Sequence, residues 1–349
     1  MYMTNDIAAP LADEGDALAR LYAGRSLSES EAEGLFALLV QGRMAEPAIA
    51  AMLVALKVKG ESVDELIGAA RALRAACVPF DRPAYLFADS CGTGGDGAGT
   101  INLSTAVAFV AAAAGLPVAK HGNRSFSSLC GSADVLEALG VRLDVPAMVS
   151  RRALDETGIC FLFAPAYHPG LRHAGPVRKA LKVRTMMNVL GPCLNPASPP
   201  VQLLGVAEPR LFDPVARTLA ALGVERALVV HGGGLDEIAA HAATEAALLA
   251  DGRIERISLA PEDAGLRRRS LIALEGGGPD ENAGRLRALL QGKGSEAEAE
   301  AVALNTGALL MVAGKAATLR QGTTLALDTL ASGRPFALLQ ALVETTNAG

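Results

Sequence analysis

The first 80 residues show the hydrophobic spacing of a helical bundle. Apolar side chains recur every three or four positions there, in the sets Ala32, Leu35, Leu38, Leu39 and Ile49, Met52, Leu53, Leu56. Two helix starts carry the capping box S-x-x-E, formed by Ser28 with Glu31 and by Ser62 with Glu65. The pattern predicts a small all-helical domain over residues 1–80.

After Pro83 the pattern changes to short apolar runs that alternate with helical segments. The runs predict strands at residues 85–88, 117–119, 159–163, 201–206, 227–230 and 270–274. Helical patterns lie between them, at residues 132–139 and 213–222 among others. This alternation predicts an α/β fold, with a mainly parallel central sheet flanked by helices. Ligands of such sheets bind at the carboxyl ends of the strands.

Residues 165–200 interrupt the alternation with proline-rich loops around one helical piece. That piece, residues 175–190, carries four cations: Arg178, Lys179, Lys182 and Arg184. We expect the segment around residues 175–195 to return to the amino-terminal helices. The predicted domains are thus 1–80, joined by this segment, and 81–349, interrupted by it. An alanine- and leucine-rich helical tail occupies residues 296–342.

Composition narrows the class of protein. The net charge of -5 and the pI near 5.7 argue against a general nucleic-acid or membrane partner. The cysteines are Cys77, Cys91, Cys130, Cys160 and Cys193, and none forms a close pair of the CxxC type. Scattered cysteines of odd number indicate reduced intracellular thiols, and the amino terminus lacks a signal pattern. We therefore expect a cytoplasmic protein.

Residues 89–132 carry the strongest chemical signal. Two loops rich in glycine and hydroxyl groups flank a helical segment without charge. No acid lies between Asp96 and Asp134, whereas Lys120 and Arg124 supply positive charge. Free backbone N–H groups, hydroxyls and unopposed cations indicate a pocket for a large anion.

The run from Gly92 to Gly97 matches the dinucleotide fingerprint G-x-G-x-x-G. That fingerprint requires an acid about 20 residues later to bind the ribose hydroxyls. Residues 116–120 contain no acid. The sequence also does not match the phosphate-binding loop of nucleoside triphosphatases, because Gly99 is followed by Thr100 and not by a lysine. The glycines therefore do not indicate a nucleotide site of either type.

Several motifs in a fixed order resemble the anthranilate phosphoribosyltransferase family, of the nucleoside phosphorylase and phosphoribosyltransferase superfamily. They are GTGGDG, T-x-N-x-S-T, KHGNR, GSADVLEALG, PAYHP, PVRKALKVRT, NVLGPCLNP and GLDE. The resemblance covers almost the whole chain. It implies transfer of the phosphoribosyl group of 5-phosphoribosyl 1-pyrophosphate (PRPP) to the amine of anthranilate, in tryptophan biosynthesis. It also implies a magnesium-dependent enzyme, with two ions, and a homodimer.

The resemblance assigns site residues by position. PRPP would be held by Gly92, Gly95, Asp96, Thr100, Asn102, Leu103, Ser104, Thr105, Lys120, His121, Gly122, Asn123, Arg124, Ser125, Ser127, Ser128 and Ser132. Anthranilate would be held by Gly92, Asn123 and Arg178, with Arg178 facing the carboxylate. Magnesium would be bound by Ser104, Asp236 and Glu237. No side chain is assigned as a covalent nucleophile, because none is needed if the mechanism is dissociative and the amine of anthranilate attacks the ribose directly.

Some points stay open at the level of sequence. His121 and His168 fit either the acceptor pocket or a structural hydrogen bond. The family usually has a lysine and a small residue where this chain has Leu129 and Cys130. Two alternative functions are kept: a relative of pyrimidine-nucleoside phosphorylases, which uses inorganic phosphate, and a non-catalytic relative that binds nucleic acid.

Overall fold

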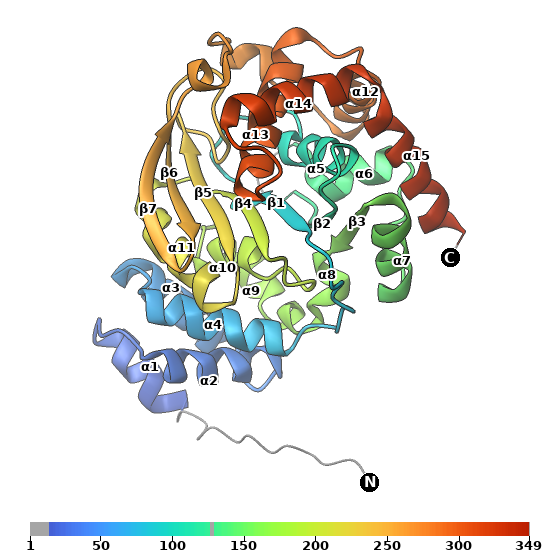
Figure 1. The fold of residues 1–349 in the computed structure, drawn as a ribbon. Coiled ribbons are helices and arrows are strands. Elements are labelled where there is room, and N and C mark those ends of the chain that lie inside the picture. Colours follow the sequence, from blue (N-terminus) through green and yellow to red (C-terminus); the bar gives the residue numbers. More distant parts are fainter. Residues whose placement is uncertain (1–13, 126–128, 349) are drawn as a thin grey trace. The chain divides into compact units, whose positions relative to one another are not determined.

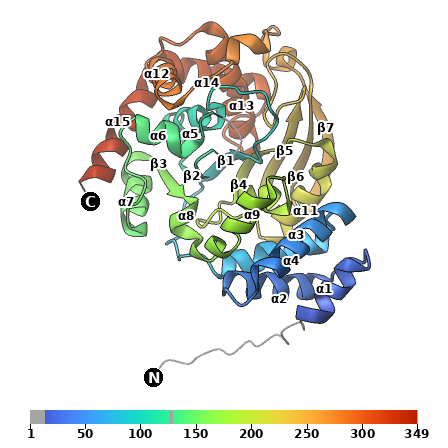
Figure 2. The same ribbon diagram turned by 180° about the vertical axis from the view of Figure 1, so that it is seen from behind.

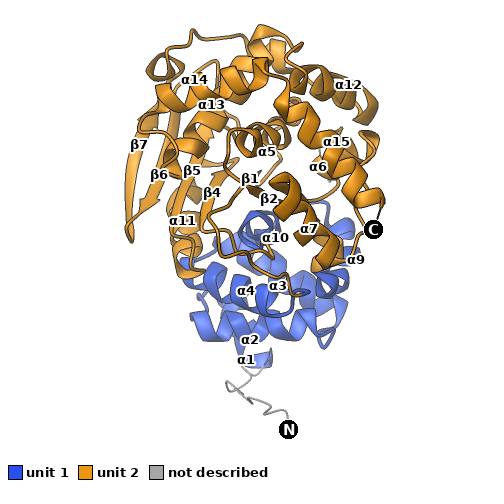
Figure 3. Ribbon diagram, turned by 45° about the vertical axis from the view of Figure 1, so that its right-hand side comes forward, with its two compact units in different colours: residues 1–78, 168–194 blue, residues 79–167, 195–349 orange. Residues whose placement is uncertain are grey.

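The structure is a computed structural model that describes residues 14–125 and 129–348. The chain divides into two compact units (Figure 3). Unit 1 consists of Met1–Val78 and His168–Leu194, and unit 2 consists of Pro79–Tyr167 and Asn195–Gly349. The segment with the four cations therefore belongs to the same unit as the amino-terminal helices.

The secondary-structure elements in the described part of unit 1 are all helices. Its elements are α1 (Glu14–Tyr22), α2 (Glu29–Val40), α3 (Glu46–Lys59), α4 (Val63–Ala75), η1 (Pro169–His173), α9 (Gly175–Leu181), α10 (Met186–Leu190) and η2 (Gly191–Cys193). Both capping boxes are confirmed, at the starts of α2 and α4. The single helix predicted at residues 175–190 is wrong. Lys182 ends α9 in a left-handed conformation with φ 52°, and Thr185 starts α10.

Glu65 ties the helices of unit 1 together. Its side chain is fully buried, and its Oε1 accepts a hydrogen bond from the N–H of Leu27 at 2.9 Å. Its Oε2 accepts from Lys59 Nζ and from the N–H of Ser62, both at 2.8 Å. One carboxylate thus joins the chain before α2, the end of α3 and the start of α4.

Unit 2 contains the central sheet. Its strands are β1 (Ala88–Gly92), β2 (Val118–Gly122), β3 (Ile159–Phe163), β4 (Val201–Gly205), β5 (Arg226–Gly232), β6 (Thr244–Ala250) and β7 (Arg253–Leu259). Among the described residues these strands form one sheet in the order β3-β2-β1-β4-β5-β6-β7. The pairings from β3 to β5 are parallel, whereas β6 is antiparallel to β5 and to β7. The predicted α/β fold with a mainly parallel sheet is confirmed.

Two strand predictions need correction, and one hairpin was not predicted. The first strand begins at Ala88, not at residue 85. The prediction missed it because Asp89 and Ser90 are polar although buried, and a search for apolar runs does not find such residues. Residues 270–274 end in a short 3-10 helix and not in a strand. The hairpin of β6 and β7 was missed, although Asp251-Gly252, both with positive φ, is a turn pair typical of hairpins.

The helices of unit 2 cover this sheet. They are α5 (Leu103–Ala113), α6 (Ser132–Ala138), α7 (Ala147–Thr157), α8 (Ala164–Tyr167), α11 (Phe212–Ala221), α12 (Pro279–Leu290), α13 (Glu296–Val312), α14 (Leu319–Ala331) and α15 (Arg334–Asn347), with short 3-10 turns η3 (Pro209–Leu211), η4 (Pro261–Ala264) and η5 (Leu271–Leu274). Helix α13 packs on α5, β4 and β5, while α15 runs beside α7 (Figures 1 and 2). No helix in the described part of the chain is long and apolar enough to cross a membrane.

The order of the strands places a switch point beside β1. The chain moves from β1 to β2 toward one edge of the sheet and from β4 to β5 toward the other edge. Because such crossovers are right-handed, α5 and α11 lie on opposite faces of the sheet. The loops that follow β1 and β4 therefore diverge at the carboxyl ends of these strands, where ligands of open α/β sheets bind.

Candidate active site

The loop after β1 is fixed at both ends by backbone hydrogen bonds. At its start, the N–H of Thr93 donates to the carbonyl of Gly205 at 2.9 Å. At its end, the N–H of Ile101 donates to the carbonyl of Leu274, and the N–H of Gly276 donates to that of Gly99 at 2.7 Å. Between these points Gly94, Gly95, Gly97 and Gly99 all have positive φ. Side chains would strain this path, so the glycines are required by the backbone.

We call the loop after β1, residues 93–101, the glycine loop. A second loop, residues 233–239, contacts it; we call this one the acid loop because it contains Asp236 and Glu237. The Oδ2 of Asp236 accepts a hydrogen bond from the N–H of Gly94 at 2.6 Å. The N–H of Asp236 donates to Asp96 Oδ2 at 3.4 Å. A Cβ atom at Gly205 would overlap the carbonyl of Asp236. The close approach of the acid loop to β4 therefore requires glycine at position 205.

The acids of this region repel one another. Burial raises the pKa of Asp236 to about 7, and the neighbouring Asp96 adds to the shift. Removal from water raises the pKa of Glu237 to about 8, and the charge of Asp236 acts in the same direction. Lys120 and a hydrogen bond from the backbone of Ser104 oppose this shift of the Glu237 pKa. A divalent cation would stabilise the charged form of both carboxyls.

These oxygens fit magnesium bound together with a phosphorylated ligand. The described residues contain no group of three or more His, Cys, Asp or Glu side chains placed to hold a metal by themselves. Magnesium is usually bound through one or two carboxylates, substrate phosphates and water. The hard oxygens of Asp236, Glu237 and Ser104 match that preference.

Lys120 lies in β2 and is almost fully buried. Its Nζ donates to the carbonyl of Ser90 at 2.5 Å and to Ser104 Oγ at 3.2 Å. The fully buried Asp89 accepts from the N–H of His121 at 3.3 Å. Burial raises the pKa of Asp89, and Lys120 opposes that rise. Lys120 thus links β1, β2 and the start of α5.

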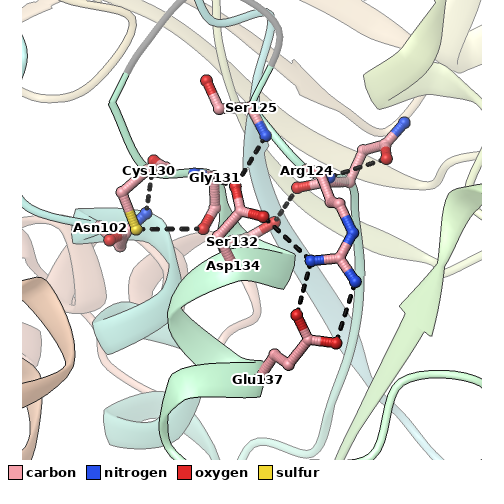
Figure 4. A network of polar contacts seen from close by, with 9 residues as sticks. Asn102, Arg124, Ser125, Cys130, Gly131, Ser132, Asp134 and Glu137 are labelled. Atoms are coloured by element: carbon pink, nitrogen blue, oxygen red, sulfur yellow. Dashed lines mark hydrogen bonds and ion pairs between the residues drawn. The ribbon is translucent and has the colours of Figure 1, made fainter. Parts of the chain in front are cut away.

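The loop after β2 is organised by acids of α6 (Figure 4). The Oδ2 of Asp134 accepts from the N–H groups of Ser125 at 3.0 Å and Gly131 at 2.9 Å. Arg124 donates to both carboxylate oxygens of Glu137, and to Asp134 Oδ1 at 3.2 Å. The sequence shows no acid within this loop, but the fold supplies two from the next helix. The positive charge of Arg124 is therefore opposed.

Asn102, at the start of α5, connects the end of the glycine loop to the loop after β2. Its Nδ2 donates to the carbonyl of Cys130 at 3.1 Å, and its Oδ1 accepts from Asn282 Nδ2 at 3.0 Å. Asn282 is buried in α12 and accepts the N–H of Gly277 at 2.8 Å. Sequence reasoning missed Asn282, because its role depends on a contact across 180 residues.

The structure groups the predicted residues by element. Around β1 and its loop lie Gly92, Gly95, Asp96 and Thr100; at the start of α5 lie Asn102, Leu103, Ser104 and Thr105; along β2 and after it lie Lys120, His121, Gly122, Asn123, Arg124 and Ser125; and Ser132 begins α6. Ser132 Oγ donates to the carbonyl of Asn123 at 3.3 Å. Ser127 and Ser128 lie outside the described residues.

Arg178 belongs to unit 1, in α9. Its side chain is half-buried, whereas Lys179 and Lys182 are exposed. Burial lowers the pKa of Arg178. The burial distinguishes Arg178 from the two lysines, and Arg184 is half-buried as well. In the same unit, His168 Nε2 lies 3.0 Å from the carbonyl oxygen of Leu194 and the ring is buried, which favours a structural role for this histidine.

Family models match both parts of the chain. The model described as "Glycosyl transferase family, a/b domain" matches residues 84–336, and "Glycosyl transferase family, helical bundle domain" matches residues 15–77. The chain is thus a member of a glycosyl transferase family that has these two parts.

Individual relatives narrow the class further. The anthranilate phosphoribosyltransferase of Sorangium cellulosum is 60% identical over 329 residues, which are 94% of each chain. The structure of the Thermus thermophilus enzyme of the same name has a TM-score of 0.90 and 44% identity, covering 95% of this chain and 99% of the other. The Saccharomyces cerevisiae enzyme, solved in complex with PRPP and Mg, has a TM-score of 0.88 and 25% identity, covering 97% and 99%. The chain belongs to the anthranilate phosphoribosyltransferase family.

Proposed function

We propose that the chain transfers the phosphoribosyl group of PRPP to the amine of anthranilate, giving N-(5-phosphoribosyl)anthranilate and pyrophosphate. Membership in the family supports this reaction. The observation that carries it is the hydrogen bond between Gly94 and Asp236, which joins the glycine loop to the acid loop. Backbone N–H donors and metal-binding oxygens thereby meet at one strand end, where a pyrophosphate group needs both.

The glycine loop and the loop after β2 would hold PRPP. Gly95, Asp96, Thr100 and the first turn of α5 offer backbone and side-chain groups on one side. Lys120, Asn123 and Arg124 offer cations and an amide on the other. The orientation of these groups before the reaction would supply much of the rate, because a positioned donor does not need to reorganise as charge develops.

Ser104, Asp236 and Glu237 would bind magnesium, with two ions as the proposed number. The complex of the yeast relative with PRPP and Mg supports a magnesium-dependent reaction. When bound, magnesium neutralises the negative charge that develops on the departing pyrophosphate. The acids also position the glycine loop, through the bond of Asp236 to Gly94.

Anthranilate would contact Gly92 and Asn123, with Arg178 facing its carboxylate. A guanidinium donates two parallel hydrogen bonds to a carboxylate, which a lysine cannot do. The amine attacks C1 of the ribose as the bond to pyrophosphate breaks, so no covalent intermediate on the protein is required. By family, we also propose a homodimer that acts in tryptophan biosynthesis in the cytoplasm.

One assay tests the reaction. Anthranilate fluorescence is followed after the protein is mixed with PRPP and magnesium, and its loss is the expected result. Turnover of a pyrimidine nucleoside with inorganic phosphate, without any loss of anthranilate, would replace the proposal with the phosphorylase alternative. The double variant Asp236→Asn, Glu237→Gln should require a higher magnesium concentration for half-maximal rate; an unchanged magnesium titration would reject these two ligands.

A further inference from the structure

Asn305 forms a paired hydrogen bond with the backbone of the acid loop. It lies in α13, and its side chain is fully buried. Its Oδ1 accepts from the N–H of Ile238 at 2.9 Å, and its Nδ2 donates to the carbonyl of the same residue at 2.9 Å. The Nδ2 also donates to the carbonyl of Ala301 at 3.0 Å. Because donor meets acceptor on both sides, the amide fits in one orientation only.

The hydrogen bonds between Asn305 and Ile238 lie next to the two acids of the acid loop. Ile238 directly follows Asp236 and Glu237. The next N–H, that of Ala239, donates to the buried Thr244 Oγ1 at 2.9 Å. At the other end of the loop, Gly232 and Leu235 exchange backbone hydrogen bonds of 3.0 and 2.9 Å. The direction of the two acids is thus fixed on their carboxyl side by α13 and β6.

The packing of α13 alone does not explain an asparagine at this position. Residue 305 is surrounded by a hydrophobic core that includes Leu304, Ala308 and Leu309 of the same helix. A buried amide without partners is unfavourable in such surroundings, and asparagine is a weak helix former. The paired bond to Ile238 satisfies the amide and two peptide groups that would otherwise be buried without partners.

We infer that Asn305 is a positioning residue, which holds the acid loop so that Asp236 and Glu237 face the magnesium and pyrophosphate of PRPP. The inference rests on the metal ligands of the proposed function. Residues that hydrogen-bond to metal ligands and orient them contribute strongly to metal binding, and their loss lowers the metal affinity about 10- to 100-fold. The hydrogen bonds of the Asn305 side chain go to backbone groups of Ile238 and Ala301, so its effect on the two acids passes through the backbone of Ile238.

The test separates metal-dependent from metal-independent binding of PRPP. The affinity for PRPP is measured by calorimetry with magnesium and again with a chelator, for the wild type and for Asn305→Leu. We expect the metal-dependent gain in affinity to fall at least tenfold in the variant, with binding in chelator unchanged. The control is Thr306→Val, the next residue of α13, which is also fully buried and whose hydroxyl has no partner among the described residues. It should match the wild type in both measurements.

A second variant guards against misfolding. Asn305→Ser leaves space for a water molecule and keeps a polar group near Ile238, but it cannot form both fixed bonds. A thermal melt shows which variants are folded. If a folded Asn305→Ser or Asn305→Leu protein keeps the metal-dependent gain of the wild type within twofold, Asn305 is not a positioning residue.

The measurement on the wild type separates a failure of the assigned metal ligands from a failure of the role of Asn305. If magnesium does not change the affinity of the wild type for PRPP, the assigned metal ligands are wrong, and the inference fails with them. If magnesium strengthens binding in the wild type and equally in both Asn305 variants, the metal site stands and only the role of Asn305 is overturned.

Discussion

The guanidinium of Arg124 donates to both carboxylate oxygens of Glu137, at 2.7 and 2.9 Å. The same guanidinium lies 5.7 Å from the centre of the Phe163 ring. Both partners of the ion pair are about half exposed. Exposed pairs of this kind contribute only about 0–1 kcal/mol, so a phosphate of higher charge can replace Glu137. In the proposed complex with PRPP, Arg124 would therefore have to leave this carboxylate before it binds phosphate.

Glu137→Gln is expected to strengthen PRPP binding. The substitution keeps the shape of the side chain but removes the charge that competes with phosphate for Arg124. The KM for PRPP should fall by up to about fivefold, since the pair is weak. Steady-state rates at saturating anthranilate measure this change.

The control for this prediction is a double-variant cycle. Arg124→Ala alone should raise the KM for PRPP, and adding Glu137→Gln to it should change nothing further, because the competing partner is already gone. A higher KM in the single Glu137→Gln protein would show that Glu137 supports the loop and does not compete with phosphate.

The pairing of Arg124 also shows how far the sequence can predict the site. Local features were predictable: Ser28 with Glu31 lie one helical turn apart, so their capping box can be read from the sequence. Residues 97–133 contain no acid. The acids Asp134 and Glu137 of α6 nevertheless bond to the loop after β2, because the fold places α6 beside it. The sequence indicates which residues are charged, while the fold decides which charges face one another.

The missed parts of the site depend on contacts between distant segments. Asn305 reaches Ile238 across 67 residues, and Asn282 reaches Asn102 across 180. No periodicity connects such pairs, because each depends on how α13 and α12 pack on the rest of unit 2. The strand β1 was misplaced for a related reason. Its residues Asp89 and Ser90 are polar but buried, so a search for apolar runs does not find them.

Arg178→Ala is expected to weaken anthranilate binding. Loss of hydrogen bonds to a charged group is worth about 1.5–3 kcal/mol, which corresponds to roughly a 10- to 100-fold higher KM for anthranilate. The KM for PRPP should change little. Lys179→Ala is the matched control, because Lys179 is the adjacent cation of α9 and is exposed. Equal anthranilate kinetics in the two variants would remove Arg178 from the acceptor site.

Glu65→Ala is expected to destabilise unit 1. The substitution leaves the N–H groups of Leu27 and Ser62 and the ammonium of Lys59 without their shared acceptor. Removing one partner of a buried ion pair costs about 3–5 kcal/mol. Urea denaturation measures this change in the free energy of unfolding.

The exposed Glu46, in the first turn of α3, provides the control variant Glu46→Ala, which should lose less than about 1 kcal/mol. A similar loss in both variants would contradict the role of Glu65.

His168 should make the protein sensitive to acid. Burial lowers the pKa of His168 to about 4, and the charge of Arg74 acts in the same direction. The unfolded chain binds a proton at this residue below about pH 6.5, while the folded chain stays neutral there. Stability from this residue is thus complete above pH 6.5 and decreases as the pH falls toward 4. At pH 4.5 the loss of unfolding free energy should reach about 2–3 kcal/mol.

The variant His168→Gln keeps a donor in reach of the Leu194 carbonyl and does not titrate, so its free energy of unfolding should fall less between pH 7 and pH 4.5. Urea denaturation of both proteins at the two pH values decides the matter: if the two curves shift equally with pH, His168 is not the group that titrates.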